Sequence, residues 1–247
     1  QFKKDFFVIK GCFEKAQSID EIQCSLKVGE NKVLKCNQKK YKRFSDHIGK
    51  FPVIIISPTD TDLIIEGSEV RRKYIDSTIA QYNKDYIKTL INYNRALKQR
   101  NSLLKKFSEK GYFDDLSLEI YTDQLITLGK IIFEERIKFL DTLIPVFNKY
   151  YNEISGAREN VDLDYKSQLK EGDYKILIQN SLSKDCLSCY TQVGVHKDDI
   201  IFKMNDYPIK KMGSQGQQKS FLIALKLAQF EFIRERIGFK PILLLDD

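Results

Sequence analysis

The chain has 247 residues, of which 42% are hydrophobic and 30% charged, and it carries a formal net charge of +7. This length and balance predict a globular protein with one large or two small domains and exclude a disordered chain. The positive charge favours a polyanionic partner, although a modest excess over this length is also typical of a solvated surface.

The sequence has the features of neither a membrane nor a secreted protein. No apolar run approaches the roughly 20 residues of a membrane span, and the first residues lack the apolar region of a signal peptide. Five cysteines without framework spacing argue against a disulfide scaffold. We therefore expect a cytoplasmic protein with no membrane partner and with buried thiols. A single C-x-x-C pair, Cys186 and Cys189, is too little for a zinc site.

Residues 1–59 predict a β-rich segment. Residues 6–9 and 22–28 have strand patterns, and a turn at Gly29 leads into 32–36, which predicts a half-buried antiparallel hairpin. The continuous apolar run at 51–56 predicts an interior strand. Pro58 then suggests a boundary.

Residues 60–157 predict helices with almost no strand pattern. Helices are expected over 69–81, over 85–107, and from Asp114 or Asp115 to about 154, where apolar residues recur at helical spacing. Pro145 is expected to kink or break the third helix, because proline removes a backbone hydrogen bond. The pattern indicates a helical subdomain, and an independent helical bundle fits the periodicity equally well.

Residues 158–247 return to strands. Strands are expected at 174–178 and 200–204, with a turn at Asn205-Asp206 leading into 207–209. A helix is expected over about 217–236, ending at Gly238. Its buried face would consist of Phe221, Leu225, Ala228 and Phe232.

Two motifs near the end of the chain indicate chemistry. Gly213-Ser-Gln-Gly-Gln-Gln-Lys-Ser220 is a glycine-containing loop leading into a helix, whose free N–H groups and dipole suit a phosphate. Pro241-Ile-Leu-Leu-Leu-Asp-Asp247 predicts a buried parallel strand that delivers two carboxylates to a ligand crevice. Each motif alone is common, but their order, with one helix between them, is more specific.

These motifs resemble the signature motif and Walker B strand of ABC-type ATPases, and Ser214-Gln-Gly-Gln-Gln218 is similar to the wording of the RecF family of bacterial DNA-repair ATPases. Three further stretches resemble RecF motifs: the segment 57–76, Tyr93-Asn-Arg-Ala-Leu-Lys-Gln-Arg-Asn101, and Gly194-Val-His-Lys-Asp-Asp199. Departures from the family pattern occur at Thr59, Glu66, Ser68, Val195 and Lys197. The resemblance covers nearly the whole chain.

The resemblance implies a mixed α/β fold, namely an incomplete ABC-type ATPase head made of residues 1–59 and 158–247, with residues 60–157 inserted as an all-helical lid. No G-x-x-x-x-G-K-[ST] motif occurs in the sequence. We therefore expect a fragment that lacks the Walker A segment and is inactive alone, whereas the complete protein would be a weak ATPase.

The resemblance also implies site residues and partners. Ser214, Gln215, Gly216 and Gln217 would bind ATP in trans across an ATP-dependent homodimer. Asp246 would hold Mg²⁺, and Asp247 would be the general base that orients the attacking water. The protein would act in DNA replication, recombinational repair and the SOS response, with RecO and RecR at single-stranded gaps.

Basic clusters indicate a surface for duplex DNA. The candidates are Arg71, Arg72, Lys98, Arg100, Lys105 and Lys106, with a further cluster at 39–43. Spacing alone does not distinguish phosphate contacts from solvated charge, and Arg71 and Arg72 also suit lid packing.

For His196 we expect hydrogen bonding that positions the signature region, rather than metal binding. Two alternatives stay open for the whole chain. One is a binding module for DNA or RecR without catalysis, and the other is a different head of the SMC type.

Overall fold

The structure is a computed structural model that describes residues 5–15 and 18–246. Two compact units are present, residues 1–52 and residues 53–247. Among the described residues, no helix combines the length and the apolar character needed to cross a bilayer.

The first unit is a four-stranded antiparallel sheet in the order β1-β2-β3-β4. Its strands are β1 (Phe6–Lys15), β2 (Ser18–Lys27), β3 (Val33–Cys36) and β4 (Lys39–Lys40), followed by the 3-10 helix η1 (Phe44–Asp46). The predicted hairpin of β2 and β3 is confirmed, and β1 is longer than expected because it pairs with β2 along its whole length. The expectation of buried thiols is wrong, since Cys12 is exposed and the other cysteines are half-buried.

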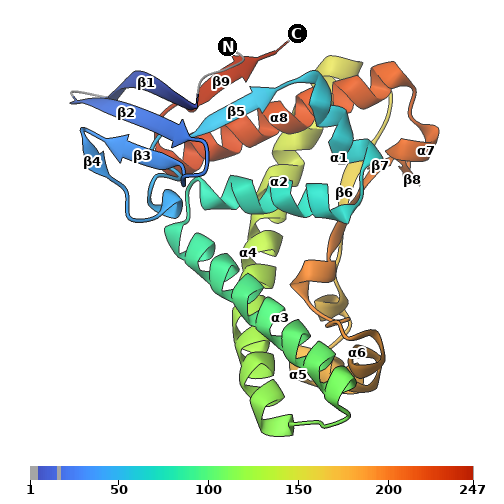
Figure 1. The fold of residues 1–247 in the computed structure, drawn as a ribbon. Helices are drawn as coiled ribbons and strands as arrows, with labels where there is room; N and C mark the ends of the chain where they lie inside the picture. Colours follow the sequence, from blue (N-terminus) through green and yellow to red (C-terminus); the bar gives the residue numbers. More distant parts are fainter. Residues whose placement is uncertain (1–4, 16–17, 247) are drawn as a thin grey trace. The chain divides into compact units, whose positions relative to one another are not determined.

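Three helices of the second unit confirm the helical segment. They are α2 (Ser68–Ala80), α3 (Lys84–Lys110) and α4 (Asp115–Ser155), preceded by η2 (Pro58–Thr61) and α1 (Asp62–Ile65). Helix α3 starts where the Asn83 side chain accepts hydrogen bonds from two backbone N–H groups, and it ends at Gly111 with φ 62°. The Asp114 side chain caps α4. Figure 1 shows α3 and α4 as the two arms of a long hairpin.

Helix α4 runs across Pro145 without interruption, so of the two predicted effects, a kink or a break, the break is wrong. Proline removes one backbone hydrogen bond of the helix, at a cost of about 3 kcal/mol. Burial on both sides of it offsets this cost, because Leu143 and Phe147 are completely buried. Phe147 packs edge-on against Phe221 of α8, with ring centroids 4.7 Å apart.

The remaining elements follow α4 in the order β6 (Val161–Lys166), η3 (Gln168–Lys170), α5 (Tyr174–Asn180), α6 (Leu182–Ser188), η4 (Val195–Lys197), β7 (Asp199–Met204), β8 (Tyr207–Pro208), α7 (Ile209–Met212), α8 (Gln215–Ile237) and β9 (Ile242–Leu245). Strands β6, β7 and β8 form an antiparallel sheet in that order. Asn205 and Asp206, both at positive φ, make the predicted turn between β7 and β8.

The strand predicted at 174–178 is wrong, because these residues form α5. The Asp173 side chain accepts hydrogen bonds from the N–H groups of Lys175 and Ile176, which starts a helix. Tyr174 and Ile178, four residues apart, are then buried on one face. The strand of this region is β6, which the sequence analysis missed although buried and exposed residues alternate along it.

Strands β5 (Val53–Ile56) and β9 form a parallel pair. The parallel direction expected for β9 is confirmed, but its expected burial is wrong, because all four of its residues are exposed. Among the described residues only β5 hydrogen-bonds to β9, and one neighbour covers little of a strand. The predicted face of α8 is confirmed, since Phe221, Leu225, Ala228 and Phe232 are all buried.

Candidate functional site

The amino end of α8 presents the predicted phosphate-binding residues to solvent. We call residues 213–217 the signature loop; its residues Ser214, Gln215 and Gly216 are exposed. Ser214 is the N-cap: its Oγ accepts from Gln217 N at 3.3 Å, and its own N–H donates to Gln217 Oε1 at 2.8 Å. A Cβ at Gly216 would meet no atom within 4 Å, so a ligand has room to approach the backbone there.

Two clefts flank the signature loop. One, of about 610 Å³, is lined by Gln215 and Lys219 of α8, by Ser57 after β5, and by Leu245 and Asp246 at the end of β9. The other, of about 510 Å³, is lined by Gly216 and Gln217 and by residues from the carboxyl end of α4 to Glu159. The two predicted motifs therefore meet at the first cleft, through Gln215 and Asp246.

Asp246 is the exposed carboxylate of the first cleft. Its backbone N–H donates to Ile56 O at 2.9 Å, which extends the pairing of β9 with β5 by one residue. A second carboxylate in this cleft, Asp60, is engaged by Lys226 at 2.6 Å and by the N–H of Ser57. Asp247, the predicted general base, lies outside the described residues.

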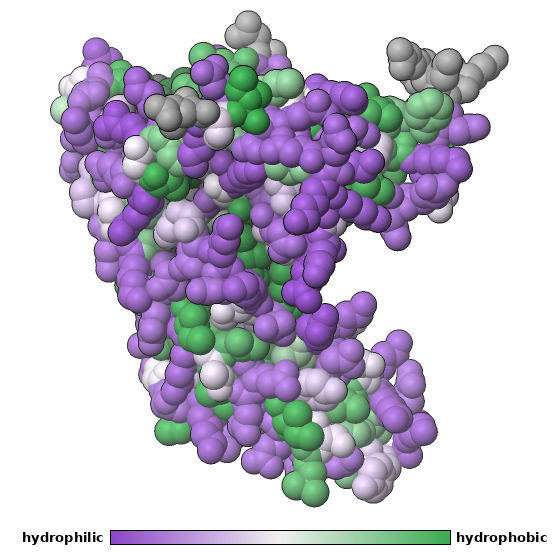
Figure 2. All heavy atoms as spheres, turned by 90° about the vertical axis from the view of Figure 1, so that its left-hand side faces the viewer, coloured by the Kyte–Doolittle hydropathy of each residue, from purple (hydrophilic) through white to green (hydrophobic). Residues whose placement is uncertain are grey.

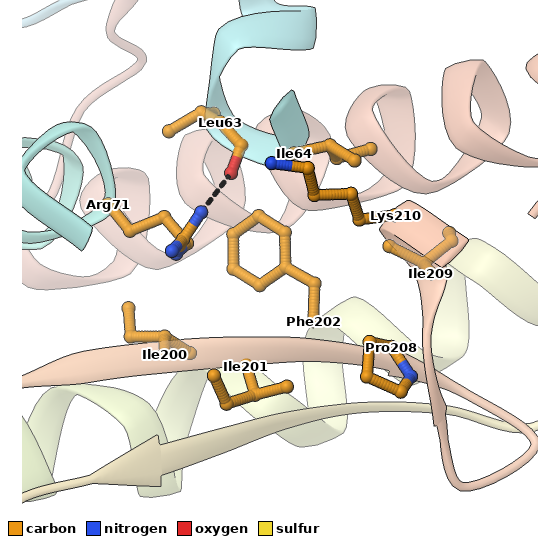
Figure 3. A pocket seen from close by; sticks show the side chains of 9 residues that line it. All are labelled: Leu63, Ile64, Arg71, Ile200, Ile201, Phe202, Pro208, Ile209 and Lys210. Carbon is orange, nitrogen blue, oxygen red and sulfur yellow. Dashed lines mark hydrogen bonds between the residues drawn. The ribbon is translucent and has the colours of Figure 1, made fainter. Parts of the chain in front are cut away.

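The predicted DNA contact Arg71 is engaged inside the protein. Its Nε and Nη2 donate to the two carboxylate oxygens of Asp199 at 2.7 and 3.0 Å, and Nη1 donates to the carbonyls of Leu63 and Glu66. Figure 3 shows the Arg71 side chain facing a small apolar cavity of about 100 Å³ beside Phe202. These contacts favour the packing alternative for Arg71.

Arg72 is also turned inward. Its Nη1 donates to Ser68 Oγ at 2.7 Å and to the carbonyl of Asp198 at 2.6 Å. Arg71 thus joins α2 to the first residue of β7, and Arg72 joins α2 to the residue before it, which favours packing for both arginines.

The prediction that Arg100 contacts DNA is wrong. Only 1% of its surface is exposed. Its Nη1 donates to Asp185 Oδ2 at 2.7 Å and to Thr191 Oγ1 at 2.8 Å, and its Nε donates to Thr122 Oγ1 at 3.0 Å. A guanidinium held in this way joins α3 to α6 and does not reach a phosphate.

Lys98, Lys105 and Lys106 have the exposure that DNA binding requires. They lie on the carboxyl half of α3, and Lys105 is 4.0 Å from Glu109. Beyond them, Tyr112 and Phe113 in the turn between α3 and α4 and Leu116 and Ile120 at the start of α4 are exposed. Figure 2 shows a mostly hydrophilic face with apolar side chains near its lower end.

His196 is held by hydrogen bonds, as expected. Its Nε2 bonds the carbonyl of Thr191 at 3.0 Å, so Nε2 carries the proton, and its Nδ1 accepts from the Tyr93 hydroxyl at 2.8 Å. Burial, together with the positive charges of Lys197, Arg72 and Arg100, lowers the pKa of His196 to about 4, although its hydrogen bond to Thr191 opposes the shift. The bonded partners lie in α3 and in the segment before η4, rather than in the signature loop.

A buried arginine that sequence reasoning missed lies at the centre of the second unit. Arg136 of α4 donates through Nε and Nη2 to Asp76 of α2, at 3.0 and 2.9 Å, and through Nη1 to Asp198 at 2.8 Å. Burial raises the pKa of Asp198, and the Arg136 guanidinium opposes that rise. Position 136 belongs to the stripe Ile132, Phe139 and Leu143, so a charged residue on an apolar face was the available signal.

The stretches that carry the family resemblance pack against one another. Besides the Arg71–Asp199 and Tyr93–His196 contacts, Asn101 Oδ1 accepts from Thr191 N and Oγ1 at 2.8 and 2.7 Å. These polar contacts fix α3 to the segment between α6 and β7, and α2 to the first residue of β7.

The chain is similar to curated proteins named DNA replication and repair protein RecF. It is 53% identical over 244 residues to the protein of Flavobacterium johnsoniae, covering 99% of this chain and 68% of the relative. It is 44% identical over 245 residues to the protein of Phocaeicola vulgatus, covering 98% of this chain and 65% of the relative. The chain therefore spans about two thirds of the length of these relatives. No protein-family model matches it.

Two solved structures share the fold over the whole chain. They are described as the recombination mediator protein RecF-ATPrS and RecF-ATP in the RecFOR pathway, with TM-scores of 0.91 and 0.92. Each is 35% identical to this chain, which covers 69% and 68% of their lengths respectively.

Proposed function

The chain belongs to the RecF family of DNA replication and repair proteins, and we propose that it supplies the signature loop and the magnesium ligand of an ATP-dependent DNA clamp. The observation that carries this proposal is the exposed amino end of α8. There the capping box uses the side chains of Ser214 and Gln217 and leaves the backbone of Gln215 and Gly216 open to an anion.

The acceptor for this loop would be the ATP of a second protomer. A helix of 23 residues whose first two residues are exposed offers N–H donors and a positive dipole end to a terminal phosphate. The solved relatives described with ATP and ATPrS support a nucleotide as the ligand. We propose that Ser214, Gln215, Gly216 and Gln217 contact it in trans, so that ATP joins two protomers.

The residues of the first cleft fit a magnesium ion. Mg²⁺ is usually bound by one or two carboxylates together with water and substrate phosphates. Asp246 offers an exposed carboxylate at the end of a strand, whereas Asp60 is neutralised by Lys226. When bound, the ion would neutralise phosphate charge. Asp246 would hold it, and Asp247 would orient the attacking water.

DNA would bind along the carboxyl half of α3, through Lys98, Lys105 and Lys106, in the helical lid of residues 60–157. Their exposure supports this assignment. We also propose that RecR and RecO are partners at single-stranded gaps in recombinational repair and the SOS response, in the cytoplasm. The description of the solved relatives as members of the RecFOR pathway supports this part of the proposal.

Two substitutions in the complete gene product that contains this chain test the in-trans assignment. Asp247→Asn removes the proposed base but keeps an oxygen, so ATP should bind and the dimer should persist while hydrolysis falls. Ser214→Arg puts bulk and charge into the closing surface, so ATP should bind without dimerisation. Light scattering with and without ATP measures the dimerisation of both variants.

Dimer formation by Ser214→Arg would refute the in-trans assignment. The signature loop would then be assigned to a ligand bound in the cleft of its own protomer. Loss of the dimer in Asp247→Asn would refute the role given to that carboxylate.

A further inference from the structure

The turn between α4 and β6 lies against the signature loop and is fixed at both ends. At its start, Gly156 has φ 70° and the N–H of Ala157 donates to Asn152 O at 3.0 Å. At its end, Asn160 exchanges two hydrogen bonds with Asn205, at 2.8 and 2.9 Å. Glu159 therefore stands on a backbone that is anchored independently of α8.

The Glu159 carboxylate joins α4 to the signature loop. Its Oε1 accepts from Gln217 Nε2 at 2.9 Å, and its Oε2 accepts from the Tyr151 hydroxyl at 3.3 Å. Tyr151 lies in the last turns of α4 and is completely buried. Burial and the nearby Glu159 charge raise the pKa of Tyr151 to about 12, so its hydroxyl keeps its proton at neutral pH and donates.

Both ends of the Gln217 side chain are thereby occupied. Its Oε1 accepts from Ser214 N at 2.8 Å, and its Nε2 donates to Glu159. A glutamine side chain that is free to rotate spends part of its time away from the cap, whereas one held at both ends keeps the N-cap residue in place. The hydrogen bonds thus run from Tyr151 through Glu159 and Gln217 to Ser214.

We propose that Glu159 is a positioning residue that couples the carboxyl end of α4 to the closing of the signature loop on a nucleotide. This inference rests on the proposed function. It adds that α4, one arm of the helical hairpin, sets the geometry of the loop, so that a change at the hairpin reaches the dimer interface through one carboxylate.

Hydrogen exchange of the complete gene product without nucleotide provides the first test. Glu159→Ala releases the Gln217 side chain, so the Ser214 amide should exchange about fivefold faster, as expected for a weakened cap. Glu159→Gln keeps an acceptor for Gln217 Nε2 and should restore slow exchange. Glu153→Ala is the matched control, because Glu153 is exposed on the same cleft and no described hydrogen bond joins it to the loop.

Dimerisation provides the second test, by sedimentation at saturating ATP. Glu159→Ala should weaken ATP-dependent dimerisation about tenfold, within the usual range of couplings between sites. ATP affinity of the monomer should stay unchanged when measured in the Ser214→Arg background, which prevents dimerisation. Glu159→Gln and Glu153→Ala should dimerise like the unchanged protein.

The outcomes separate this inference from the proposed function. Normal dimerisation and exchange in Glu159→Ala, while Ser214→Arg stays monomeric, overturn the role of Glu159 alone. A Glu159→Gln protein as defective as Glu159→Ala also overturns it, because the negative charge and not the hydrogen bond would then matter. Dimerisation by Ser214→Arg overturns the proposed function.

Discussion

Replacing Arg100 with methionine should destabilise the protein and leave DNA binding by the folded protein unchanged. Arg100 and Asp185 form an ion pair at 2.7 Å whose side chains are only 1% and 0% exposed. Methionine fills part of the space but leaves the Asp185 carboxylate buried without a cation. The hydrogen-bond donors that remain to the Asp185 carboxylate are the Gln192 N–H at 2.9 Å and the Ser181 hydroxyl at 3.4 Å.

The expected loss is about 3–5 kcal/mol in the free energy of unfolding, because an uncompensated charge stays buried. In a chain of this size about 1 kcal/mol shifts the melting temperature by about 2–4 °C, so a decrease of about 6–20 °C is expected. Removing both charges in Arg100→Met/Asp185→Leu should recover about 2 kcal/mol relative to Arg100→Met.

Urea denaturation of the four proteins of this double-mutant cycle measures the energies. Duplex affinity is measured at a temperature where all four are folded. The reasoning would be refuted if Arg100→Met kept its stability and lost duplex affinity, because Arg100 would then have to reach DNA. It would also fail if the double substitution were less stable than Arg100→Met.

Two further predictions concern pH and salt. The folded protein keeps His196 neutral, with its pKa near 4, whereas the unfolded chain takes up a proton near pH 6.5, so stability should fall by up to about 3 kcal/mol as the pH drops from 6.5 to 4. His196→Gln should flatten this part of the stability curve in chemical denaturation, and an unchanged curve would show that other groups govern it. Lys105→Ala/Lys106→Ala should reduce the slope of log affinity for duplex DNA against log salt by about 2 without changing stability, because each lost phosphate contact contributes about 0.9. An equal slope in both proteins would assign these lysines to the solvated surface.

The amino end of α8 and the carboxyl end of β9 show which parts of the candidate site could be predicted from the sequence. Ser214 and Gly238, at the two ends of α8, carry start and stop signals that act within one turn of the helix, so its position could be predicted. The carboxylate of Asp246 was placed correctly at a strand end. Its surroundings could not be predicted, because Asp60 and Lys226 meet only when α8 packs near β5.

Local signals determined the long helices and the hairpin of the first unit, because caps and periodicities act between residues that are close in the chain. The motifs and their order along the sequence were enough to indicate the family. Only the tertiary structure decided which charges are free. Arg100 and Lys105 are basic residues of the same helix, yet Arg100 faces Asp185 and Lys105 faces solvent. The partner of Arg100 is 85 residues away in the sequence, and burial of a charge depends on such distant partners.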